Sequence, residues 1–471
     1  MRGRMRRYKR AMITTGILVG AVAIGAIAAH QGPNNQVLHT IVLRGQAYDL
    51  AVDAQAHRAV VIGIDNATGY ASTLDTTTGA LVRTVALALG STPSDVAVDA
   101  RTGRVFITDI GDGTVSVLDA RNGALLRIVT VGEIQPHDLR RIAVDPRTDR
   151  VFVSSSPVTR PNPALSAVHM LDARTGAVLH TTMTGGGSLA VDNRDGQAFV
   201  ANLTGNSISV LDGRTGARVR MIALGASTGA LHLAADGRTG RVFVATDAGL
   251  RVIDARTGRV LHAIPLPGVR NEALEVDEAH NRVVVVDDRL ASPYTASFRL
   301  LDARTGALVR ATAVTGASSV VLDRHRGRAV VGTASGVRAF DVRTGTPLWT
   351  CAGDTGACGG SAVDARTGRV FGVDPGMIDS VGAHIGAGSV IVLDGRTGAR
   401  QSVTPVGVYA GPLMIDEQAG HAIVVNDGGV VRASDAWGWV PAGLRQRLPF
   451  LPPPAGTRTV DGSVSVLDAT R

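Results

Sequence analysis

The sequence predicts an all-β protein: a single closed β-propeller of four-stranded antiparallel blades, preceded by one N-terminal transmembrane helix. Three observations support this prediction. Two short motifs alternate along most of the 471 residues, and the alternation repeats roughly every 45 residues, which suits a four-stranded blade. The last repeat lacks a strand that a segment near the N-terminus can supply. Aromatic residues make up only 3% of the chain, so Val, Ala, Leu and Ile must build the core, and their β-branched members suit buried strands.

The N-terminal residues differ from the rest of the chain. Six of the 48 basic residues lie in 1–10, followed by the uncharged run AMITTGILVGAVAIGAIAA at 11–29, which is long enough to cross a bilayer as a helix. We predict a basic cytoplasmic region at 1–10, a signal anchor or signal peptide at 11–29 and a short linker at 30–36. Positive charge stays on the cytoplasmic side, so the remainder is expected outside the cytoplasm. It is membrane-anchored, or secreted if residues 1–28 are cleaved.

The net charge of +8 is concentrated in that leader. Without the six leader charges, 42 basic residues face 40 acidic ones. A body so close to neutral lacks the basic surface that phosphate binding requires, and we therefore expect no nucleic-acid partner.

The repeats begin after the linker and consist of two motifs in strict alternation. One is VLDARNGALLR at 117–127 and LLDARTGALVR at 300–310; the other is SDVAVDARTGRVFITD at 94–109. Nine copies of each can be counted. The aspartates that close the first strand of each unit are Asp53, Asp99, Asp145, Asp192, Asp236, Asp277, Asp323, Asp364 and Asp416.

Each motif is expected to be a β-hairpin. Its D-x-R-T-G centre places a carboxylate where it can accept loop amides and a glycine where the chain needs a left-handed residue. With strands named a to d, the two motifs join a to b and c to d, so both turns leave on one face of the ring. The b-to-c and d-to-a connections vary and share the opposite face.

The two ends of the repeat region complete each other. The chain stops at GSVSVLDATR after strand c of the ninth unit, and VLHTIVLRG at 37–45 resembles the d strands. We predict a propeller over 37–471, closed by strand 37–45 pairing with strand 463–468, because closure removes open sheet edges. Nine repeats are counted, and eight or seven blades remain if a looser unit is a loop.

These repeats resemble a known family. The string VSVLDARTGALLR, followed by a loop and VAVDxxTGRVFV, is similar to the YVTN β-propeller repeat of YncE-like and surface-layer proteins. The resemblance implies an exported propeller that serves as a binding or structural module. One unit, VVGTASGVRAFDVRTGTPLWT at 330–350, instead resembles the repeat of quinoprotein dehydrogenases, in which a tryptophan closes the blade.

The two cysteines, Cys351 and Cys358, lie close together in CAGDTGAC. In an exported protein such a pair favours a local disulfide. The alternative is two small buried thiols. Their spacing fits neither haem attachment nor zinc knuckles.

Candidates for chemistry are few. Asp109 and Asp112, Asp287 and Asp288, and the trio of Asp374, Asp379 and His384 fall on the variable face, where they either bind a cation or act as solvated turn acids, the interpretation we favour. His137 and Asp138 form an adjacent pair that can supply a general base or sit in a surface loop. No G-x-S-x-G or G-x-x-x-x-G-K-[ST] motif is present. We predict no catalytic residue, no metal and no cofactor.

The last unit carries an insertion at 428–462. It holds two of the three tryptophans and a concentrated apolar patch with two arginines. The predicted interaction patch comprises Trp437, Trp439, Leu444, Arg445, Arg447, Leu448 and Phe450. Three interpretations stay open: the insertion caps the ring, lies on the membrane surface, or docks a partner protein.

The sequence therefore favours a non-catalytic extracytoplasmic propeller, a binding or scaffold module at the cell surface and a monomer. Its partner, whether a protein or a small molecule, is not specified. The alternative is a propeller enzyme, such as a lyase, a lactonase or a quinoprotein-like dehydrogenase, with its site on the variable-loop face.

Overall fold

The computed structural model describes residues 37–110, 113–131, 137–157, 166–192, 194–202, 206–225, 230–246, 248–265, 270–288, 296–352, 360–378, 384–385, 387–432 and 457–470. The predicted N-terminal helix lies outside these residues. Within them, no helix combines the length and hydrophobicity that crossing a bilayer requires.

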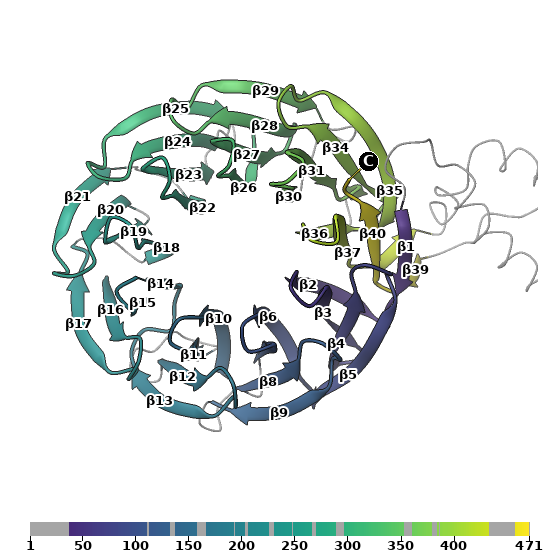
Figure 1. Ribbon diagram of the computed structural model, residues 1–471, viewed down its shortest axis with the longest axis horizontal. Coiled ribbons are helices and arrows are strands. Elements are labelled where there is room, and N and C mark those ends of the chain that lie inside the picture. Colours follow the sequence, from purple (N-terminus) through teal and green to yellow (C-terminus); the bar gives the residue numbers. More distant parts are fainter. Residues whose placement is uncertain are drawn as a thin grey trace, which may run out of the picture.

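Nine four-stranded antiparallel sheets form a ring (Figure 1), which confirms the predicted nine-bladed all-β propeller. In each blade, strand a lies nearest the axis of the ring and strand d lies at the rim. The sheets follow the chain in a meander, so the sequence motifs fall on the same strands in every blade. A tenth, smaller sheet stands outside this pattern.

The inner half of each blade consists of strands a and b. In order from blade 1 to blade 9, the strands a are β2 (Gln46–Asp53), β6 (Thr92–Asp99), β10 (His137–Asp145), β14 (Leu189–Asp192), β18 (Ala230–Asp236), β22 (Arg270–Asp277), β26 (Ala317–Asp323), β30 (Gly360–Val363) and β36 (Ala410–Asp416). The strands b are β3 (Arg58–Asp65), β7 (Arg104–Ile110), β11 (Arg150–Pro157), β15 (Gln197–Asn202), β19 (Arg241–Thr246), β23 (Arg282–Asp288), β27 (Arg328–Thr333), β31 (Arg369–Asp374) and β37 (His421–Asn426).

The outer half of each blade follows the same order. The strands c are β4 (Thr68–Asp75), β8 (Thr114–Asp119), β12 (Ala167–Asp172), β16 (Ser207–Asp212), β20 (Gly249–Asp254), β24 (Ala296–Asp302), β28 (Gly336–Asp341), β34 (Ala387–Asp394) and β40 (Ser463–Asp468). The strands d are β5 (Leu81–Leu89), β9 (Leu125–Thr130), β13 (Val178–Met183), β17 (Arg218–Ala223), β21 (Val260–Pro265), β25 (Leu308–Val314), β29 (Pro347–Ala352), β35 (Arg400–Val408) and β1 (Val37–Val42).

The ring is closed by strands from both ends of the chain. β1 pairs antiparallel with β40, with Thr40 opposite Ser465 and Val42 opposite Ser463. β40 in turn pairs with β37, so the ninth blade has the order β1-β40-β37-β36. The Leu43 amide donates to the Gly462 carbonyl at 2.9 Å and extends the seam.

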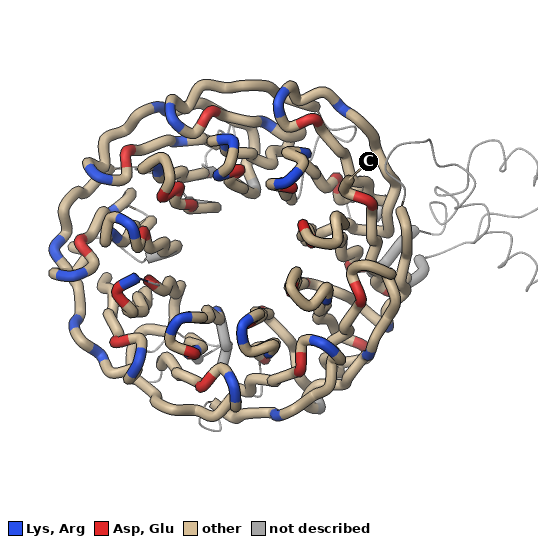
Figure 2. Tube along the Cα trace, viewed as in Figure 1, with Lys and Arg blue, Asp and Glu red and all other residues tan. Residues whose placement is uncertain are grey.

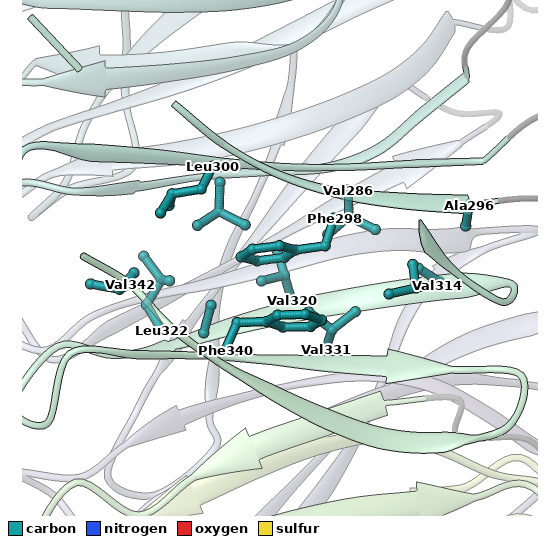
Figure 3. Close-up of a cluster of buried hydrophobic side chains, with 13 residues drawn as sticks. Val286, Ala296, Phe298, Leu300, Val314, Val320, Leu322, Val331, Phe340 and Val342 are labelled. Carbon is teal, nitrogen blue, oxygen red and sulfur yellow. The ribbon is translucent and has the colours of Figure 1, made fainter. Parts of the chain in front are cut away.

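The hydrophobic core is divided among the interfaces between blades. Nine clusters of buried side chains are found in the described residues, and each draws on two neighbouring blades. Figure 3 shows the cluster between blades 6 and 7, where the Phe298 and Phe340 rings stack with centroids 4.0 Å apart. Strands b are buried on both faces because a blade packs against each side of them.

The repeated aspartates organise the turns, as their spacing predicts. Asp99 accepts the Arg101 amide at 3.0 Å and the Thr102 hydroxyl at 2.7 Å, and Gly103 follows with φ of 66°. In the c-to-d turns, the hydrogen bonds from the Thr215 amide, opposed in part by burial, lower the pKa of Asp212. In the described residues, positions of acidic and basic residues are interspersed around the ring (Figure 2).

The meander separates the connections by face. The a-to-b and c-to-d turns share one face, which we call the plain face. The b-to-c and d-to-a connections share the other, which we call the variable face.

Candidate functional site

The variable face carries the small tenth sheet. It consists of β32 (Met377–Ile378), β33 (His384–Ile385), β38 (Gly429–Arg432) and β39 (Thr457–Val460). β32 and β33 belong to the b-to-c connection of blade 8, and β38 and β39 to that of blade 9. β33 pairs parallel with β38 through His384 and Val431. Two neighbouring insertions are thereby hydrogen-bonded into one structure.

Hydrogen bonds on both sides of this sheet anchor it to the ring. The Asp427 amide donates to the Tyr409 carbonyl at 3.0 Å, just before β38 begins. After β39, an Asp461 carboxylate oxygen accepts the Gly45 amide at 3.2 Å. The sheet is therefore tied to the connection between blades 8 and 9 and to that between blades 9 and 1.

The predicted interaction patch, residues Trp437 to Phe450, lies outside the described residues, and all three interpretations of it stay predictions. The structure does place the ends of the segment that contains it. Arg432 and Thr457 are direct partners in the β38–β39 pair, so residues 433–456 leave and re-enter the small sheet at adjacent positions.

The predicted cation ligands are engaged in separate local contacts. Asp109 accepts the Thr92 amide at 2.9 Å, Asp374 accepts the Gly376 amide at 3.0 Å, and Asp287 pairs with Arg299 at 2.6 Å. Asp112 and Asp379 lie outside the described residues, as do the side chains of Asp288 and His384. Within the described part of the chain, no three His, Cys, Asp or Glu side chains are grouped to hold a metal ion.

These three aspartates occupy one repeated position, the sixth residue of strand b. The position is buried and polar in most blades, and its occupants are Asp109, Ser155, Asn202, Thr246, Asp287, Thr333, Asp374 and Asn426. Thr246 donates to the Gly249 carbonyl at 2.7 Å and Thr333 to the Gly336 carbonyl at 2.8 Å. The position therefore shapes the connections of the variable face. Its aspartates are at most 2% exposed, so the expectation that they are solvated is wrong.

The remaining sequence candidates stay predictions. The backbone of His137 and Asp138 lies at the start of β10, opposite Pro157 and Ser156, but their side chains are not among those described. Cys351 lies half-buried in β29. Its proposed disulfide partner, Cys358, lies outside the described residues.

Sequence reasoning missed one cluster of charges on the inner strands. Asp49, Asp95 and Arg141 stand at the same place in β2, β6 and β10, four residues before the closing aspartate. Burial, with a smaller contribution from the Asp95 charge, raises the pKa of Asp49 to about 6, although the Leu50 amide and Arg141 oppose this. Burial also raises the pKa of Asp95, which accepts the Ile142 amide of the next blade at 3.2 Å. A comparison of the repeats at this position could have found the cluster.

Trp349 joins blade 7 to blade 8. Its indole Nε1–H donates to the Gly395 carbonyl at 2.9 Å, and the ring is 9% exposed. It packs on Gly398, where an added Cβ would lie 2.6 Å from the ring. These contacts join two blades, whereas the resemblance implied a tryptophan that closes its own blade.

Similarity to solved structures is broad and low in identity. Dihydro-heme d1 dehydrogenase NirN in complex with DHE has a TM-score of 0.56 and 14% identity, covering 83% of this chain and 84% of that one. BamB from Moraxella catarrhalis has a TM-score of 0.48 and 16% identity, covering 92% and 99%. The computationally designed Ika8 protein has a TM-score of 0.49 and 18% identity, covering 72% and 94%. The NirN likeness supports the fold alone.

The sequence itself matches one family profile, and no curated protein matches it. The profile, described as outer membrane protein assembly factor BamB, matches residues 111–351 and again 204–438. Both ranges include the tryptophan-containing unit at 330–350, and the first alone spans more than half of the 471 residues. The propeller architecture agrees with the match, and the chain belongs to the family of the outer membrane protein assembly factor BamB.

Proposed function

We propose that this protein is a non-catalytic scaffold that binds a partner protein through the variable face of blades 8 and 9. One observation carries the proposal: the two insertions pair into the β32-β33-β38-β39 sheet, which no repeat of the ring requires. Pairing between insertions fixes their relative position, as a recognition surface needs. The description of the matched family as an assembly factor supports a role in association with other proteins.

The predicted leader belongs to the same proposal. Residues 11–29 act as a signal anchor, and the propeller works outside the cytoplasm at the cell surface, as the resemblance of the repeats to the YVTN type also implies. The apolar and arginine-rich patch at 437–450 then docks the partner, because buried aromatic and arginine side chains supply much of the energy of protein interfaces.

A deletion tests the proposal. Residues 433–456 are replaced by Asn-Gly, a two-residue turn suited to joining paired antiparallel strands, since Arg432 and Thr457 already lie opposite each other. A photo-crosslinking residue is placed at exposed Ala387 on the variable face, and in a separate variant at exposed Thr305 on the plain face.

In living cells we expect a discrete crosslinked product from position 387 that disappears in the deletion variant, while the thermal midpoint changes little. Position 305 serves as the control and yields no such product. A product that survives the deletion, or that forms equally from position 305, contradicts the assignment of partner binding to this surface.

The alternative function is enzymatic, and one observation favours it. Burial raises the pKa of Asp49 to about 6, and the charges of Asp95 and Arg141 act on it as well; a raised carboxyl pKa is typical of acid-base groups. The cluster lies in the middle of the inner strands β2, β6 and β10, close to the axis of the ring (Figure 1). Loss of a measurable activity in an Asp49→Asn variant with an intact fold would favour this function over the scaffold.

A further inference from the structure

The repeats depart from their own consensus at one place on the plain face. Two residues before the closing aspartate, six blades carry alanine: Ala51, Ala97, Ala143, Ala190, Ala234 and Ala362. Blade 6 has Glu275 instead. Directly after the closing aspartate, three blades carry alanine, whereas blades 6, 7 and 9 have Glu278, Arg324 and Glu417. Of these three, blade 6 is the one that carries Glu275, and only blade 7 lies next to it. Charges have replaced small residues in two adjacent blades.

These exceptional residues line a single open pocket. It has a volume of about 510 Å³ and spans the inner ends of blades 5, 6 and 7. Arg238 and Arg324 supply positive charge to its wall, Glu275 and Glu278 supply negative charge, and Ala234 and Ala235 leave space beside them. The volume falls within the range of small-molecule sites, which is about 300–1,000 Å³.

The charges of the pocket do not satisfy one another fully. Glu275 Oε2 and Arg324 Nη2 are 3.6 Å apart, and the two side chains are 42% and 56% exposed. A charge-assisted hydrogen bond is shorter, about 2.7–2.9 Å. Arg324 also donates to the Val276 carbonyl at 3.3 Å. Partial desolvation raises the pKa of Glu275 in spite of Arg324, while the 42% exposure of its side chain leaves the carboxylate accessible to a further positive partner.

We propose that this pocket binds a small zwitterion of about the size of a dipeptide, with its carboxylate on Arg324 and Arg238 and its ammonium on Glu275 and Glu278. The glutamates of blade 6 lie between the arginines of blades 5 and 7, so each ligand charge meets an opposite charge, which gives orientation as well as affinity. The site lies on the face opposite the proposed partner surface, so each proposal can be tested independently of the other.

Calorimetric titration of the full-length protein tests the site, with dialanine as the probe. N-acetylalanine keeps the carboxylate and lacks the ammonium, and alanylalanine amide keeps the ammonium and lacks the carboxylate. We expect dialanine to bind and each blocked compound to bind at least tenfold more weakly, because each loses one charged contact. If dialanine does not bind at millimolar concentration, or if a blocked compound binds equally well, the proposal is wrong.

Two variants locate the binding. Glu275→Ala and Arg324→Ala each install the residue that other blades carry at the same position, so the fold is expected to tolerate them. Both should weaken dialanine at least tenfold. Glu417→Ala removes an acid from the equivalent turn position of blade 9 and should leave dialanine binding unchanged. Equal binding by all three variants would overturn the assignment to this pocket.

Discussion

Single side chains hold each blade to the next. Trp349 donates its indole N–H to a turn carbonyl of blade 8. In other blades, an arginine at the start of strand b donates to a turn carbonyl of the next blade. Arg58 donates to the Arg121 carbonyl at 2.8 Å, and Arg282 donates to the Arg343 carbonyl at 3.1 Å. These arginines at the start of strand b therefore join neighbouring blades through their turns.

Substitution of two glycines tests the contact between Trp349 and the turn of blade 8. Gly398 has φ of 73°, and an added Cβ would lie 2.6 Å from the Trp349 ring; Gly103 has φ of 66° with open space around it. Gly103→Ala should cost about 1 kcal/mol from backbone strain alone. Gly398→Ala should cost at least about 1 kcal/mol more, because the Trp349 contact must also yield. Chemical denaturation compares the two variants, and equal losses would contradict the docking role.

Asp49 provides a pH test at the same scale. Its folded-state pKa of about 6 lies above the ordinary value of 3.8, so the folded protein holds this proton more tightly than the unfolded chain. The stability that the proton contributes is present at about pH 4 and is lost as the pH rises through about 6.

The Asp49→Asn variant removes this titration and should therefore gain stability over wild type as the pH rises from about 4 to 7, by a difference on the order of 1–2 kcal/mol. Urea denaturation at a series of pH values measures the difference. A difference that is independent of pH would show that Asp49 does not titrate in this range.

At the scale of elements, β1 decides whether the ring is closed. Ile41 is partly buried against the cluster shared by blades 9 and 1, whereas its neighbour Val42 is 69% exposed. Ile41→Asp should destabilise the protein by about 2–4 kcal/mol, since it places a charge against an apolar cluster. Val42→Asp should change stability by less than about 0.5 kcal/mol. Thermal unfolding of both variants is the measurement, and similar midpoints would argue against a packed β1.

The small sheet is the second element that lies beyond the repeats. Its parallel β33–β38 contact joins two connections that come from different blades. Neither insertion carries the repeat motif. The short strands β32, β33, β38 and β39 are therefore held in place by pairing with one another.

At the scale of the whole molecule, the distribution of the core predicts cooperative unfolding. Each blade contributes to two of the nine clusters of buried side chains, and none of these clusters lies within one blade. A blade that separates from the ring therefore exposes the buried apolar side chains of both neighbouring blades. We expect thermal unfolding of the propeller to follow one transition by circular dichroism and by intrinsic fluorescence. Two separated transitions would show that groups of blades fold independently.

Much of the fold was predictable because local rules repeat. Each hairpin is predicted by its own residues: a closing aspartate, a turn glycine and alternating apolar residues in its strands. Nine pairs of such hairpins at a regular spacing imply nine blades. The unfinished ninth unit implied the role of residues 37–45, and β1 pairs with β40. Asp109 and Asp374 do accept amides of the connections, as turn acids would, but they are buried and not solvated, because strand b lies inside the blade stack.

The sequence alone determined the repeating hairpins, their number and the division into a plain and a variable face, because these follow from contacts between residues near in sequence. Only the tertiary structure decided which exceptional residues meet. Glu275 and Arg324 are 49 positions apart, as their numbers show, and face each other because adjacent blades stack in register. His384 and Val431 likewise meet because blades 8 and 9 are neighbours. Contacts between blades depend on the packing of whole sheets, which no short pattern records.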